Sequence, residues 1–175
     1  GAQAFWYAHW AGRYTLNATW TALMLAGDPF QVYRYPPMLL LTGTWLSFSF
    51  LIAKVAQGQL PLFSSALAGG VVTVLFIAGV PDPAQTFYWI GGSFTYQLPN
   101  NLLVILLGLL VWRETTAIDR RLRITLFAIS IGLVIAIVGS NEISLLLTSM
   151  ILSSGAVYAL WTQRDSRIFW IVLLV

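Results

Sequence analysis

One acidic residue, Glu142, lies between two long apolar runs, separated only by Gly139-Ser140-Asn141-Glu142. A carboxylate at the end of two membrane helices is costly to keep there, so it marks a candidate functional site. It could bind a sugar hydroxyl, a cation or a diphosphate-bound divalent metal. The structural alternative is that Asn141 caps the following helix and Glu142 occupies its first turn, where the helix dipole favours an acid.

A second candidate is the segment 87–101, which combines aromatic rings and amides around Gly91-Gly92. Sugars stack their C–H faces on rings, and their hydroxyls need amide partners, so this composition suits carbohydrate. An interfacial belt also contains aromatic residues, but a belt does not need paired amides beside a proline. The predicted substrate-binding residues of this segment are Tyr88, Trp89, Tyr96, Gln97, Asn100 and Asn101.

Two further residues near the start of the chain could contact ligands. Arg13, in an aromatic segment, could bind a phosphate bidentately, or it could extend its charged head toward the membrane interface. His9 could ligate haem or chlorophyll, but the chain has no second histidine, and we do not expect such a centre. The absence of cysteine excludes a thiolate metal site, and we predict no protein metal site and no certain cofactor.

The elements that must position these residues are membrane helices. Hydrophobic residues make up 58% of the chain and charged residues 9%, against roughly 25% charged in soluble domains. The mean hydropathy is +0.80, which is typical of an integral membrane protein. The net charge of +3 does not indicate nucleic acid binding, because the basic residues follow the ends of apolar runs and topology accounts for them.

The apolar runs predict an all-α, polytopic transmembrane bundle in a single domain over 1–175. We expect about five full spans, a partial sixth that opens at Ile168, and an interfacial helix over 10–25. Gly69-Gly70 indicates a close helix approach. Pro99 predicts a break, so that 87–112 would form a broken or re-entrant helix covered by protein or by a water-filled cavity. The expected spans are 36–56, 60–80, 101–112, 122–138 and 143–162.

The basic residues alternate between successive loops. One set holds seven residues, whereas the other side holds only Arg13 and Arg34. The positive-inside rule places the larger set in the cytoplasm, so the candidate site residues would share the opposite side of the membrane. The predicted cytoplasmic set is Lys54, Arg113, Arg120, Arg121, Arg123, Arg164 and Arg167.

The two ends of the chain predict a piece of a longer protein. The chain starts at Gly1 without a signal peptide pattern and stops within an apolar run of eight residues, 168–175. Eight helical residues cannot cross a hydrocarbon core about 30 Å thick. The alternative is a small subunit with a processed N-terminus and a short interfacial tail.

Three motifs occur in a fixed order along the chain: Trp10-Ala-Gly-Arg13-Tyr14, then Tyr88-Trp89 with Tyr96-Gln97-Leu98-Pro99, then Asn141-Glu142. This order resembles multipass bacterial membrane proteins of glycosyltransferase C type, in a poorly characterised branch with "W-x-GR-[FY]", "YW…Y-x-LP" and "NE" elements. The resemblance covers about residues 6 to 145. It implies sugar transfer from a polyprenyl-phosphate donor at the outer face of the bacterial cytoplasmic membrane.

The resemblance also implies roles for particular residues. Arg13, Tyr96, Gln97, Asn141 and Glu142 would line the lipid–sugar cavity. The catalytic acid of such enzymes precedes the "GR" element, and this chain starts too late to contain it. The catalytic residue is therefore unknown, with Glu142 as the best candidate within the chain.

Two other functions stay open from the sequence. The chain could be a non-catalytic transmembrane subunit of a respiratory or photosynthetic complex, with membrane lipids and other subunits as partners. It could also be a transporter that uses a broken helix at Pro99 and an ion site at Glu142. We rank the transporter last because the two halves show no repeat symmetry.

Overall fold

The computed structural model describes residues 13–25, 27–28, 32–162 and 167–175, and within them it contains helices and turns without strands. The predicted all-α fold is therefore confirmed. The helical elements, in chain order, are α2 (Tyr14–Leu25), α4 (Tyr35–Val55), α5 (Leu62–Gly79), α6 (Pro83–Phe87), α7 (Ile90–Gly92), the π-helix η1 (Ser93–Gln97), α8 (Leu98–Thr115), α9 (Arg120–Val138), α10 (Glu142–Trp161) and α11 (Arg167–Leu174).

Five helical segments of the described chain are long and apolar enough to cross a membrane, which confirms the prediction of a multipass membrane protein with five spans. The eight-residue helix α11 follows them, where a partial sixth span was predicted. Helix α2 forms over most of the predicted interfacial segment, of which residues 10–12 lie outside the described residues.

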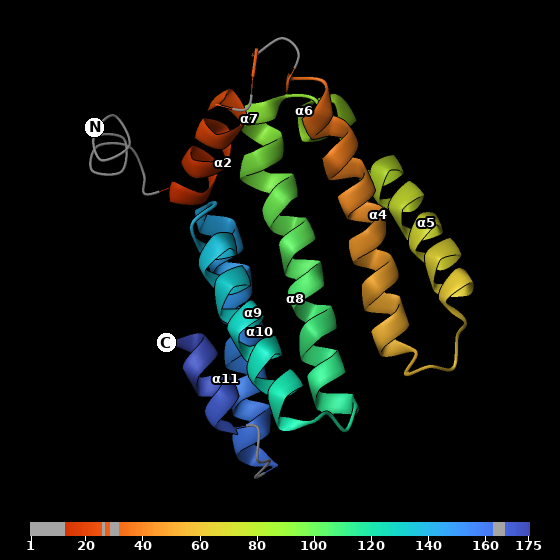
Figure 1. Ribbon diagram of the computed structural model, residues 1–175, viewed down its shortest axis with the longest axis vertical. Coiled ribbons are helices and arrows are strands. Elements are labelled where there is room, and N and C mark those ends of the chain that lie inside the picture. The colour runs from red at the N-terminus through yellow and green to blue at the C-terminus, as the bar shows by residue number, and fades with distance from the viewer. Residues whose placement is uncertain (1–12, 26, 29–31, 163–166) are drawn as a thin grey trace.

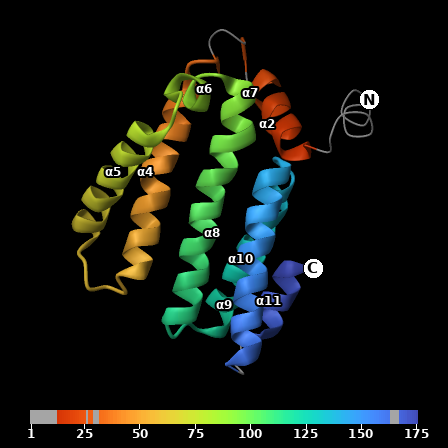
Figure 2. The same ribbon diagram turned by 180° about the vertical axis from the view of Figure 1, so that it is seen from behind.

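The continuous helix formed by η1 and α8 is the centre of the bundle. Helices α4 and α5 lie on one side of it, and α9, α10 and α11 lie on the other (Figures 1 and 2). Half of the 18-residue apolar stretch within Ser93–Thr115 is buried, against 17–28% of the corresponding stretch in each other span. The main apolar core joins this helix to the second group through Leu106, Leu110, Ile137, Leu152, Phe169 and Leu173.

Alternate loops lie at opposite ends of the bundle. The end of α4 with Lys54 and the loop between α8 and α9 lie at one end, whereas α2, α6, α7 and the turn before α10 lie at the other (Figure 1). The candidate site residues that the structure describes thus share one end, as the alternation of basic residues requires. The assignment of the basic end to the cytoplasm stays a prediction.

Close contact between α4 and α5 depends on Gly69. A Cβ atom placed there would lie 2.7 Å from the Ser49 backbone nitrogen and 2.8 Å from its Cα, so only glycine fits. On the same interface, the Trp45 indole donates to the Ala66 carbonyl at 2.9 Å. The predicted close approach at Gly69-Gly70 is confirmed, and Gly69 is the residue that requires it.

The predicted break at Pro99 is wrong. The chain is helical from Ile90 through Thr115, and the Ser93–Thr115 span is 23 residues long rather than marginal. Proline lacks an N–H and clashes with the carbonyl four residues earlier, which here belongs to Thr95. The chain accommodates Pro99 by widening the preceding turn into the π-helix η1, and the transporter hypothesis loses the broken helix on which it depended.

Candidate functional site

The start of α2 is held against the last turn of α9. The Tyr14 hydroxyl donates to the Ile135 carbonyl at 2.7 Å, and Thr15 Oγ1 donates to the Ala136 carbonyl at 2.7 Å. The Thr15 backbone N–H donates to the Gly139 carbonyl at 3.0 Å. The Ile135 carbonyl also accepts from the Gly139 N–H at 3.0 Å, and the Ala136 carbonyl also accepts from Ser140 Oγ at 2.8 Å. Helix α2 therefore adds second donors to these carbonyls at the end of α9.

Gly139 makes this contact possible, because a Cβ atom there would overlap the Tyr14 ring and lie 2.7 Å from Thr15 Oγ1. We therefore expect Gly139→Ala to displace the start of α2, with a more mobile spin label at Trp20 in electron paramagnetic resonance spectra. Gly132→Ala is the matched control, because Gly132 lies in α9, the helix that Gly139 ends, and has open space around it. Equal label mobility in both variants would contradict the docking role of Gly139.

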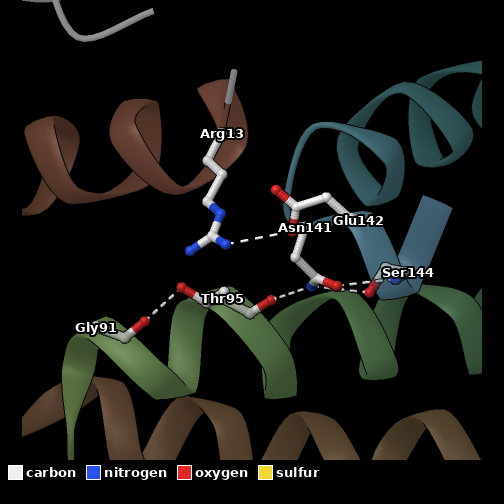
Figure 3. Close-up of polar contacts among 6 residues, drawn as sticks. All are labelled: Arg13, Gly91, Thr95, Asn141, Glu142 and Ser144. Carbon is white, nitrogen blue, oxygen red and sulfur yellow. Dashed lines mark hydrogen bonds and ion pairs between the residues drawn. The ribbon is translucent and has the colours of Figure 1, made fainter. Parts of the chain in front are cut away.

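Docking of α2 brings Arg13 to Glu142. Arg13 Nη2 lies 3.2 Å from Glu142 Oε2, and the two side chains are 34% and 65% exposed (Figure 3). An ion pair this exposed contributes little to stability. Arg13 Nε is buried without a hydrogen-bond partner among the described residues. Because Nε is buried, a ligand in the cleft can contact the guanidinium only through its terminal nitrogens.

Asn141 caps α10 and also joins it to η1. Its Oδ1 accepts from the Ser144 N–H at 2.8 Å, which confirms the capping role considered for this residue. Its Nδ2 donates to the Thr95 carbonyl and to Ser144 Oγ (Figure 3). The side chain is 4% exposed, and Glu142 follows it in the first turn of α10. The Asn141 amide is therefore engaged with protein groups on both of its polar atoms.

A cleft of about 350 Å³ lies between α2 and the segment from Trp89 to Tyr96. Small-molecule sites are commonly about 300–1,000 Å³, so this cleft is large enough for the head of a lipid-linked ligand. The Trp89 ring packs on Gly92, where a Cβ atom would lie 2.5 Å from it. The lining residues are Arg13, Leu16, Asn17, Trp89, Gly91, Gly92, Thr95 and Tyr96.

The structure brings together only some of the predicted site residues. Arg13, Trp89 and Tyr96 line the cleft, and Glu142 borders it through its contact with Arg13. Tyr88 faces a different groove, which it shares with Arg34. Asn100 is exposed next to its buried neighbour Asn101, so the paired amides point to different surroundings.

Gln97 and Asn101 lie inside the bundle, 1% and 6% exposed, where they contact α4 instead of the cleft. Gln97 Nε2 donates to Thr44 Oγ1 at 2.8 Å and to Asn101 Oδ1 at 3.0 Å. Asn101 Nδ2 donates to the Leu40 carbonyl at 3.1 Å. We call Thr44, Gln97 and Asn101 the amide cluster; it joins α4 to the central helix.

Several cleft residues were not predicted from the sequence. Leu16 and Asn17 are ordinary helix residues, and nothing in their sequence context distinguishes them. The sequence did indicate Thr95, because it lies four residues before Pro99. Its carbonyl therefore lacks the N–H that residue 99 would donate in an α-helix. That position marks Thr95 as a residue whose carbonyl needs a partner from another element.

The described residues do not contain a group of three histidine, aspartate or glutamate side chains that could hold a metal ion. His9, the residue considered for haem or chlorophyll, lies outside the described residues, as does Arg164 of the basic set. The chain matches no protein family model, no curated protein and no solved structure.

Proposed function

We propose that this cleft binds the phosphate-bearing head of a polyprenyl-phosphate-linked sugar at the extracytoplasmic face of the membrane, in a glycosyltransferase-like protein. The observation that carries the proposal is the meeting of Arg13, Trp89 and Tyr96 at one cleft. They come from two segments that are far apart in the sequence, the start of α2 and the segment 87–101, and these segments contain the first two motifs on which the resemblance was based. Because the cleft lies at the end of spanning helices, a lipid-linked ligand can enter it with its chain in the membrane.

The chemistry of the cleft fits a phosphate joined to a sugar. A guanidinium binds phosphate through charge-assisted hydrogen bonds, and Arg13 lines the cleft beside its bond to Glu142. Trp89 and Tyr96 offer exposed rings for the C–H face of a sugar. Glu142 is bonded to Arg13, so we assign it the role of holding the guanidinium at the cleft.

The test compares two arginines at the same end of the bundle. We expect Arg13→Ala to weaken binding of polyprenyl monophosphate to the protein in nanodiscs by about 10- to 100-fold, since a hydrogen bond to a charged group contributes about 1.5–3 kcal/mol. Arg34→Ala is the matched control, because Arg34 is exposed, lines a different groove and forms no ion pair within the described chain. Photo-crosslinking with a reactive polyprenyl phosphate measures both variants.

Two further measurements make the test decisive. Polyprenol, which lacks the phosphate, should bind wild type and Arg13→Ala equally, because only the phosphate meets the guanidinium. Arg13→Lys should give an intermediate loss, because lysine keeps the charge without the planar fork. If Arg13→Ala and Arg34→Ala bind polyprenyl phosphate equally, the cleft does not hold the phosphate.

A further inference from the structure

The turn before α10 is joined to the central helix by the side chain of Asn141. We propose that Asn141 is the positioning residue of the cleft. It holds Glu142 in a fixed place relative to Thr95 and Tyr96, and Glu142 in turn holds Arg13. The expected effect of Asn141 on ligand binding rests on the proposed function. Its expected effect on the geometry of the cleft does not depend on that function. Asn141 acts through other residues, because its own amide is buried and bonded to protein.

The acceptor that Asn141 uses is available because of Pro99. In a regular α-helix, the N–H of residue 99 would donate to the Thr95 carbonyl, and proline has no N–H to donate. Asn141 Nδ2 supplies a donor to that carbonyl from the neighbouring hairpin of α9 and α10. A hydrogen bond within one helix is thus replaced by a bond between two helices, and this bond joins the two sides of the site.

From Asn141 the contacts continue to the wall of the cleft. Glu142 is the next residue, and its carboxylate bonds Arg13 Nη2 at 3.2 Å. Thr95, which lines the cleft, is held on the other side by the bond from its own Oγ1 to the Gly91 carbonyl at 2.5 Å. Figure 3 shows the guanidinium of Arg13 pointing into the space between Glu142 and the turn that contains Gly91 and Thr95.

Helix capping and positioning can be separated by substitution. Serine is about as good an N-cap as asparagine, so Asn141→Ser keeps the cap on α10. Its shorter side chain lacks the amide that reaches the Thr95 carbonyl. Asn141→Ala loses both functions. A residue that only capped α10 would behave normally as serine and poorly as alanine, whereas a positioning residue fails in both variants.

The first measurement does not involve a ligand. The natural chain has no cysteine, so cysteines introduced at Trp20 on α2 and Leu39 on α4 can be spin-labelled specifically. Helix α4 is tied to the central helix by the amide cluster, so this pair reports the place of α2 relative to η1. We expect Asn141→Ser to broaden the distance distribution measured by double electron–electron resonance. A distribution equal to that of the unsubstituted labelled protein would overturn the proposal.

The second measurement is binding of polyprenyl monophosphate in nanodiscs, where we expect Asn141→Ser to weaken affinity about tenfold. Pro99→Ala supplies the missing N–H to the Thr95 carbonyl. The double variant with Pro99→Ala and Asn141→Ser should therefore have the same unfolding midpoint as Pro99→Ala alone. It should not restore affinity, because the bond between the helices is still absent. Restored affinity in the double variant would show a purely stabilising role and overturn the proposal.

If the wild type binds no polyprenyl phosphate, the proposed function fails, and the spin-label distances still decide the positioning role.

Discussion

Gly69→Ala is expected to destabilise the protein by about 1–3 kcal/mol, the usual cost of inserting a methyl group into packed structure. The new Cβ atom would meet the backbone of Ser49 on α4, within 2.7 Å of its nitrogen and 2.8 Å of its Cα. Backbone atoms of a spanning helix cannot rotate away as a side chain can, so α4 and α5 would have to separate along their interface. The measurement is the free energy of unfolding in mixed detergent micelles, followed by circular dichroism.

The neighbouring glycine supplies the control for this prediction. A Cβ atom on Gly70 would lie 3.6 Å from the Trp45 indole nitrogen, which is ordinary contact. Both substitutions replace glycine by alanine in α5 and gain the same helix propensity, up to about 1 kcal/mol. The difference between the two variants therefore isolates the clash with Ser49. If Gly70→Ala is as destabilising as Gly69→Ala, the close approach of α4 and α5 is not centred on Gly69.

Asn101→Leu is expected to destabilise the protein by about 2 kcal/mol through loss of the amide cluster. Measured hydrogen bonds between membrane helices average about 0.6 kcal/mol and reach about 1.7 kcal/mol. Asn101→Leu removes the contacts of Asn101 with Gln97 Nε2, Thr44 Oγ1 and the Leu40 carbonyl. Gln97 Nε2 and the Leu40 carbonyl both keep Thr44 Oγ1 as a partner, so the loss is that of the bonds themselves. The unfolding free energy in mixed micelles measures this loss.

Asn100→Leu is the matched control, because it makes the same chemical change at the adjacent position and Asn100 is exposed. Surface substitutions usually change stability by less than about 0.5 kcal/mol. A double-mutant cycle with Thr44→Val should show coupling with Asn101→Leu, because Thr44 Oγ1 lies 3.0 Å from Asn101 Oδ1. Additive effects in that cycle, or equal loss at the two asparagines, would show that the amide cluster does not join α4 to the central helix.

The spans could be predicted because apolar length alone determines which segments fit a membrane. The predicted 36–56 and 143–162 differ from α4 and α10 by only a residue at each end. The prediction failed at Pro99, where the usual rule for proline gave a break. The wider turn of η1 accommodates the proline, and a donor from Asn141 on another hairpin serves the Thr95 carbonyl. A residue more than 40 positions away therefore helped to decide whether this helix continued.

For the amides of the candidate site, the residue type likewise did not predict where the side chain lies in the fold. Gln97 and Asn101 were predicted to bind the substrate because they are amides in an aromatic segment, and Asn141 was predicted to line the cavity because of the family resemblance. Packing placed Gln97 and Asn101 against α4 and placed Asn141 against η1, and each amide forms hydrogen bonds with protein groups. A buried amide needs partners whether or not a ligand exists, so residue type alone could not separate these roles.

The sequence by itself determined that this protein is a multipass helical membrane protein, and the alternation of its basic residues placed Arg13, Trp89, Tyr96 and Glu142 at one end. Both depend on local properties, namely the length of an apolar run and the charge of a loop, which need no tertiary contact. Only the tertiary structure decided that Arg13 meets Glu142 beside a cleft with Trp89 and Tyr96. The reason is that their contact depends on how α2 docks on the last turn of α9, and hydrogen bonds between residues about 120 positions apart fix that docking.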